Sequence, residues 1–285
     1  MYLVQRCQLL RKILEDSVET FIVGLALNRT VFRCVVERYP DTAHMYKWHY
    51  LSCSFSWRDR LHSIINHYRF IDKHFLPNFM ISIMEGEILL WEELQDANRY
   101  SISIVYDIHC LEGDLSLIYK INGELVYTLA FAVIPGRIVN MRAVQVLFIS
   151  RIQGGHHYDL IRSSVKAFSG IRPNTMLLAA ARAIATASGI TCMAGVRTKH
   201  QIALGCKMDT MQGEVFNYDQ FWTEIGGQRL NNSQVFSVPI TPHHIPLCDR
   251  KREHRTRKMQ QYQFESNLIR EIQDTFRQKC LKLST

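Results

Sequence analysis

Several hallmarks of common protein classes are missing from this chain of 285 residues. Its eight cysteines form no C-x-x-C pair, which excludes zinc-knuckle spacing, and we expect them to be reduced thiols of a cytoplasmic protein. The apolar run at residues 21–27 is far shorter than the ~20 residues that a membrane-spanning helix needs. Charges spread through residues 1–17 argue against a secretory signal, and the lack of a G-x-S-x-G motif argues against a hydrolase nucleophile elbow.

The composition is that of a folded protein with a moderate basic excess. Hydrophobic residues make up 47% and charged residues 21%, so a disordered chain is excluded. The formal net charge of +8 is compatible with nucleic acid, anionic lipid or an acidic protein as a partner, and it identifies none of them.

The first third of the chain has a helical pattern. Ser56, followed three residues later by Asp59, is typical of a helix N-cap, and Pro77 closes the helix that it begins. Within this helix, His67 lies on the apolar side, and we expect a buried, hydrogen-bonded side chain there. The histidines and carboxylates of this segment do not have metal-ligand spacing, so no metal site is expected.

From Tyr100 onward the hydrophobic period changes to two, which is typical of strands. Asn122-Gly123, between two such runs, predicts a tight hairpin, and Pro135-Gly136 predicts the next turn. Residues 100–152 are therefore predicted to form an antiparallel meander of at least four strands, with a break in the last strand after Ser150.

The second half of the chain adds helices to this sheet. We predict two helices separated by residues 170–173, the second capped by Asn174, then a short buried strand at 190–196. An aromatic helix ending at Gly226-Gly227 and a short edge strand at 235–240 follow.

The predicted fold class is α+β, a mainly antiparallel sheet covered by helices, with a GNAT-like core as one form of it. A helical N-terminal region at 1–76, an α+β core at 77–249 and a basic C-terminal helix at 250–285 are expected to form one compact unit.

Five motifs in one order are specific although each alone is weak. They are INHYRFI from Ile65, EGDLSLIY from Glu112, ISRIQGG from Ile149, AFSGIRP from Ala167 and FNYDQFWTEIGG from Phe216. In them the chain resembles the VirK/YbjX family of Gram-negative bacterial proteins over residues 48–270, and it looks closest to the VirK proteins of enteric pathogens. The resemblance implies a link to virulence, to the production or display of surface factors and to envelope stress. It supplies no catalytic residue.

A glycine turn between a buried strand and a helix is suited to an anion cradle, because backbone N–H groups there can point outward. The run Arg151-Ile152-Gln153-Gly154-Gly155-His156 is similar to the Q/R-x-x-G-x-G/A loop with which GNAT-like acetyltransferases bind the pyrophosphate of coenzyme A. The candidate residues for acyl-CoA are Arg151, Gln153, Gly154, Gly155 and, in a rival placement at the next helix start, Arg172. His156 departs from the motif, and a purely structural turn is the competing interpretation.

Candidate acid–base residues are Glu112, His156 and His200, which lie near the predicted ends of strands or helices. A surface position is the competing interpretation for each histidine. Spacing alone does not bring any of these groups together.

Six cations cluster at the start of the last helix and could contact phosphates of RNA, of DNA or of an anionic membrane surface. They are Arg250, Lys251, Arg252, Arg255, Arg257 and Lys258. The competing interpretation is a solvated helix face whose charges pair with nearby carboxylates.

Together these features predict a cytoplasmic accessory factor for surface or envelope virulence factors, acting post-transcriptionally through RNA or protein contacts. The alternative is a GNAT-like acyltransferase that modifies an envelope component or a protein amine. Peripheral contact with the inner membrane through the basic helix is a third hypothesis.

Overall fold

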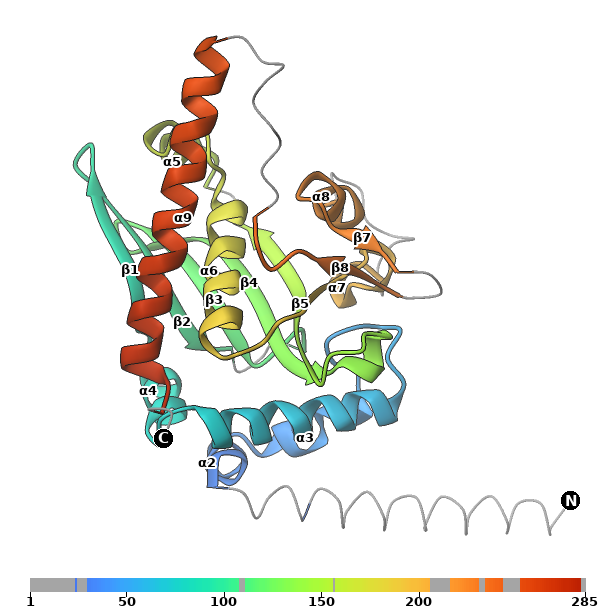
Figure 1. Ribbon diagram of the computed structural model, residues 1–285. Helices are drawn as coiled ribbons and strands as arrows, with labels where there is room; N and C mark the ends of the chain where they lie inside the picture. The colour runs from blue at the N-terminus through green and yellow to red at the C-terminus, as the bar shows by residue number, and fades with distance from the viewer. Residues whose placement is uncertain are drawn as a thin grey trace, which may run out of the picture.

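The computed structural model describes residue 24 and residues 30–107, 111–155, 157–205, 216–230, 234–242 and 252–282. Its centre is an eight-stranded sheet with helices packed around it (Figure 1). The predicted α+β class is confirmed. Helices from both ends of the described chain contribute to the same hydrophobic cluster as the strands.

The sheet has the order β1-β2-β3-β4-β5-β6-β8-β7. The strands are β1 (Ile88–Gln95), β2 (Asn98–Tyr106), β3 (Leu115–Ile121), β4 (Glu124–Pro135), β5 (Gln145–Gly154), β6 (Met193–Val196), β7 (Gln228–Arg229) and β8 (Val235–Val238). Every neighbouring pair is antiparallel except β5 and β6, which are parallel because helices connect them.

Two hairpin turns show why one strand was predicted and another was missed. Asn122 and Gly123 join β3 to β4 with φ values of 53° and 86°, as the Asn-Gly pair predicts. Asp96 and Ala97 join β1 to β2 with φ values of 50° and 64°, a conformation that alanine rarely adopts. The sequence therefore carries no recognisable turn signal at the end of β1, and the predicted meander lacked this strand.

Two predicted strand features were wrong. The strand predicted to break after Ser150 continues to Gly154, because β4 is long enough to pair with it at Gln153 and Gly154. The strand predicted as an edge, β8, lies between β6 and β7.

The helices cover the sheet on one face and at one end. They are α2 (Thr30–Arg38), α3 (Trp57–His74), α4 (Phe79–Glu85), α5 (Tyr158–Ala167), α6 (Pro173–Ala187), α7 (Ile202–Gly205), α8 (Tyr218–Glu224) and α9 (Arg252–Cys280), with 3₁₀ turns η1 (Pro40–Lys47), η2 (Gly136–Val139) and η3 (Thr198–His200). Figure 1 shows α6 and α9 side by side in front of the sheet, and α3 along its lower end.

Helix α3 begins as predicted. Ser56 accepts a hydrogen bond from the Asp59 backbone N–H, and the Asp59 carboxylate accepts one from the Ser56 N–H, which confirms the capping box. His67 is fully buried, and its Nδ1 accepts a hydrogen bond of 3.1 Å from the Val133 N–H of β4. This bond ties α3 to the sheet.

Helix α6 approaches the sheet closely because alanines fill its inner surface. It begins at Pro173, with Arg172 in the N-cap position, so the predicted Asn174 cap was wrong. Arg182 on α6 is buried and forms an ion pair of 2.9 Å with Glu265, which fixes α9 against α6.

Candidate functional site

A cluster of charged groups forms where β2 and β3 meet the continuation of β5. The Arg151 guanidinium lies 2.6 Å from the Asp107 carboxylate and 3.4 Å from the Glu112 carboxylate. Glu112 is only 6% exposed, so this pairing takes place in a largely desolvated setting. The structure thus brings together Glu112 and Arg151, which the sequence had suggested for separate roles.

Glu112 also bridges two strands. Its other carboxylate oxygen accepts a hydrogen bond from the Gln201 side chain, which follows β6 by five residues, while Arg151 comes from β5. The Gln201 amide oxygen is held in turn by the Leu204 N–H at 2.8 Å. Contacts with Arg151 and Gln201 on its two oxygens therefore fix the orientation of this carboxylate.

A bulge in β5 fixes the position of this cluster. Ser150 is left between the paired residues Arg151 and Ile149, and its hydroxyl donates to the backbone carbonyls of Ala130 and Glu112. The serine therefore fastens the β2–β3 connection onto the β5 strand.

Asp114, two residues after Glu112, has a different environment. The Tyr50 hydroxyl donates to its carboxylate at 2.9 Å, and burial raises the pKa of Asp114 to about 6 although hydrogen bonds from Tyr50 and Tyr68 oppose the shift. Gly113 separates the two acids with φ +135°, and a Cβ there would lie 3.0 Å from the Phe131 carbonyl oxygen. Sequence reasoning missed Asp114, although the tripeptide Glu-Gly-Asp was the available signal.

A cavity of about 500 Å³ opens beside the charged cluster. Its polar wall contains Arg151, Gln153, Gly154, Gly155 and Asp107, and apolar side chains of β2, β3 and β4 form the rest. Four of the five residues predicted for acyl-CoA therefore line one cavity. Its volume lies in the range of small-molecule sites.

The backbone beside this cavity is a strand edge, not an open loop. The Ile152 N–H donates to the Tyr218 hydroxyl at 3.1 Å, and the same hydroxyl donates to the Ile152 carbonyl at 3.2 Å. The Gly155 N–H donates to the Val126 carbonyl at 2.9 Å. These amides have partners within the protein, so they do not point freely at a ligand. The predicted catalytic residue His156 lies outside the described residues.

Arg172 lies in a different cavity, of about 300 Å³, between the start of α6 and helices α8 and α9. Lys258 joins it there, together with Thr175 of α6. Glu224 and Glu265 also line this cavity, and Glu265 is already paired with Arg182.

His200 is adjacent to Gln201 in the chain, and its backbone contacts the segment that precedes α3. Its carbonyl accepts hydrogen bonds from the Cys53 N–H at 2.9 Å and the Ser52 hydroxyl at 3.1 Å. Burial, aided by Lys199 and Arg197, lowers the pKa of the His200 ring.

The predicted basic run is only partly described. Arg250, Lys251 and the side chain of Arg252 lie outside the described residues. Arg255 is exposed, whereas Arg257 donates to the Ser169 carbonyl at 2.8 Å and so closes the end of α5.

The family model described as "Protein of unknown function (DUF535)" matches residues 6–274. The chain belongs to the DUF535 family. DUF535 is the VirK/YbjX family, so the family resemblance is confirmed. A Haemophilus influenzae protein described as uncharacterized is 24% identical to this DUF535 chain over 224 residues, which are 77% of this chain and 72% of that protein. No solved structure gives a significant match.

Two further properties of this DUF535 member concern only the part of the chain that the structure describes. No helix in it combines the length and apolar character needed to cross a bilayer. No three of its histidine, cysteine, aspartate or glutamate side chains are placed to hold one metal ion, and this includes the carboxylates around Arg151.

Proposed function

We propose that this protein is an acyltransferase that uses a coenzyme A thioester and acts on an amine of an envelope component or a protein. The separation of β5 and β6 carries the proposal. These parallel strands pair only from Leu147 to Ile149 and from Met193 to Gly195, after which β5 continues to Gly154 without β6. In GNAT-like acetyltransferases, to whose coenzyme A loop the sequence from Arg151 to His156 is similar, coenzyme A lies where two parallel strands separate.

The position of Glu112 supports a catalytic role where this pairing ends. Arg151 from β5 and Gln201 after β6 both contact the carboxylate. An amine must lose a proton as it attacks an acyl carbon, and Glu112 is the buried base available to take that proton. A bound thioester would supply the acyl group: the new C–N bond would replace its C–S bond, and coenzyme A would leave as the thiol, carrying the proton lost by the amine.

The phosphates of coenzyme A fit one of the two predicted places better than the other. The Arg151–Gly155 stretch is a poor cradle, because the Ile152 and Gly155 amides are already bonded within the chain. The cavity at the start of α6 offers the cations of Arg172 and Lys258 instead. We therefore assign the phosphates to Arg172 and Lys258.

Thermal unfolding with and without coenzyme A tests this assignment. Ligand at 100 times its Kd stabilises the folded state by about 2.7 kcal/mol, which should raise Tm by roughly 5–10 °C. The double variant R172A/K258A should lose the shift. R255A, which removes an exposed cation from the same helix as Lys258, should keep it. An unchanged Tm with millimolar coenzyme A and with its acetyl ester would overturn the proposal.

We propose as a second role that this protein supports surface or envelope virulence factors. In this role it acts post-transcriptionally in the cytoplasm. The proposal rests on likeness to the VirK proteins of enteric pathogens. The exposed Arg255 and the basic residues before it favour contact with phosphates of RNA or of the inner membrane. RNA binding that weakens steeply with salt, with a smaller slope after R250A/K251A/R255A, would support it. Salt-independent binding or none would remove the RNA route.

A further inference from the structure

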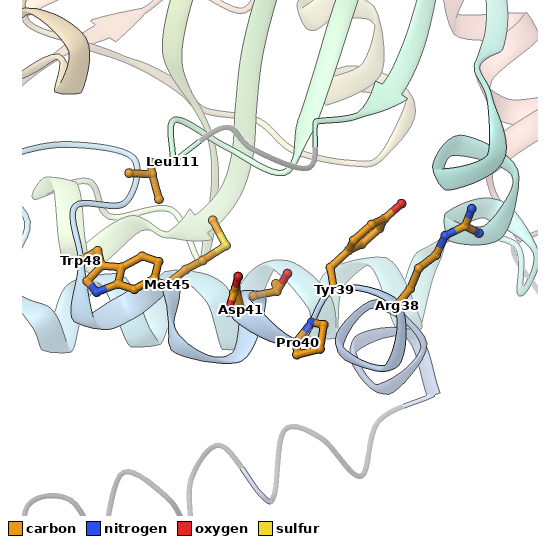
Figure 2. Close-up of a pocket in the computed structure, with 8 residues that line it drawn as sticks. Arg38, Tyr39, Pro40, Asp41, Met45, Trp48 and Leu111 are labelled. Atoms are coloured by element: carbon orange, nitrogen blue, oxygen red, sulfur yellow. The ribbon is translucent and has the colours of Figure 1, made fainter.

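A third cavity, of about 390 Å³, lies between the η1 turn and the β2–β3 connection. Figure 2 shows Met45 and Trp48 on the η1 side, with Leu111 above them and Tyr39 farther along the same wall. The volume is that of a site for a small molecule or a chain of carbon atoms.

The lining selects a neutral, apolar occupant. Arg38 and Asp41 contribute one charge of each sign, and Arg38 already lies 3.7 Å from the Glu85 carboxylate. The hydroxyl of Thr42 is engaged with Tyr106. The side chains of Pro40, Met45, Trp48 and Leu111 give the rest of the lining an apolar surface, against which a hydrocarbon chain would lose no hydrogen bonds with water.

Trp48 supports the presence of an occupant. Its side chain is 55% exposed, which leaves a large aromatic surface in water at the rim of an apolar cavity. Burying such a surface against a ligand is favourable, because the gain is roughly proportional to the apolar area removed from water.

The cavity lies next to the charged cluster around Arg151, and two contacts connect them. Leu111, which lines it, precedes Glu112 directly, and the Leu111 carbonyl is held by the Leu51 N–H at 2.7 Å. Tyr39 stacks on Tyr106 with 5.6 Å between ring centroids, and Tyr106 lines the cavity beside Arg151. The apolar cavity and the charged one are therefore neighbours, with the Tyr39 and Tyr106 rings in contact between them.

From this geometry we propose that the cavity holds the aliphatic chain of the acyl group. The preferred donor is then a thioester of a medium-chain or longer fatty acid, not of acetate. This inference rests on the proposed acyl transfer near Glu112, and it names the substrate class of that site.

Titration calorimetry with coenzyme A and its acetyl, octanoyl and dodecanoyl esters tests the inference, with free dodecanoate as a separate probe. Each buried methylene should tighten binding about fourfold until the cavity is filled. Dodecanoate should also shift the fluorescence of Trp48 to shorter wavelength.

The variants W48A and L111N should lose the gain with chain length while binding of coenzyme A itself is unchanged. L94A is the matched control, because it removes an apolar side chain that is 75% exposed on β1, outside the cavity. Circular dichroism and Tm establish that each variant is folded.

Two results separate this inference from the acyltransferase proposal. The proposed acyl-chain cavity is overturned if coenzyme A binds but its esters bind no more tightly. It is also overturned if affinity still rises with chain length in both W48A and L111N. In either case the acyltransferase proposal stands. If dodecanoate binds and shifts Trp48 fluorescence while coenzyme A does not bind, the chain site is supported and the coenzyme A assignment fails.

Discussion

The pH dependence of stability should reveal two buried groups that titrate in opposite senses. Burial lowers the pKa of His67 to about 3, against an ordinary value of 6.5, and raises the pKa of Asp114 to about 6, against 3.8. Between pH 6.5 and 3 the unfolded chain binds a proton at His67 that the folded protein does not. Between pH 6 and 3.8 the folded protein binds a proton at Asp114 that the unfolded chain does not. Acid therefore destabilises through His67 and stabilises through Asp114.

The magnitudes follow from the size of each pKa shift. The full effect of His67 is about 5 kcal/mol and that of Asp114 about 3 kcal/mol, because one pKa unit is worth about 1.36 kcal/mol. On lowering the pH from 7 to 4, His67 should remove about 3 kcal/mol and Asp114 should restore roughly 2 kcal/mol. The wild-type protein should consequently lose less than about 1 kcal/mol from this pair.

The substitution D114N isolates the His67 contribution. Asparagine keeps an oxygen that can accept the Tyr50 hydrogen bond, but it does not titrate. The free energy of unfolding of D114N should fall by roughly 2 kcal/mol more than that of the wild type between pH 7 and 4, measured by urea denaturation at each pH. D41N, which alters an exposed carboxylate, is the control. If the stability of wild type and D114N changed with pH in parallel, the conclusion that burial raises the pKa of Asp114 would be refuted.

Three further substitutions test the structure directly. G113A should lower stability by roughly 1–3 kcal/mol in urea denaturation, because φ +135° and contact with Phe131 exclude a side chain; an unchanged midpoint would contradict this backbone. S56A should cost about 1 kcal/mol through loss of the capping box, and no loss would mean that α3 begins elsewhere. E265Q should lower the free energy of unfolding by about 3–5 kcal/mol, because Arg182 is left buried without its anion. The double variant R182M/E265L removes both charges and should recover much of that stability. Equal losses of stability in the two variants would contradict the pairing.

Local signals were sufficient for much of the fold. The Asn122-Gly123 hairpin and the Ser56 cap depend on a few neighbouring residues, so the sequence alone predicted both correctly. β1 was missed because its turn at Asp96-Ala97 uses positive φ without glycine. A turn can be predicted from the local sequence only where its residue types, such as Asn-Gly, favour the backbone conformation that the turn requires.

The candidate site depended on long-range geometry. Glu112 and Arg151 were both singled out, but their pairing requires the β5 bulge at Ser150, and Gln201 arrives from a segment that follows β6. The role of Asp114 depends on Tyr50, which is 64 residues away in the chain. Spacing in the sequence does not encode these contacts.

We propose that Glu112 and the part of β5 that continues past its pairing with β6 form a site for an acyl thioester. Isothermal titration of wild-type protein and E112Q with octanoyl-coenzyme A, followed by detection of free thiol in the presence of a primary amine, tests it most directly. The account predicts saturable binding to both proteins and thiol release by the wild type alone. Absence of binding by the wild type, or equal thiol release by E112Q, would contradict it.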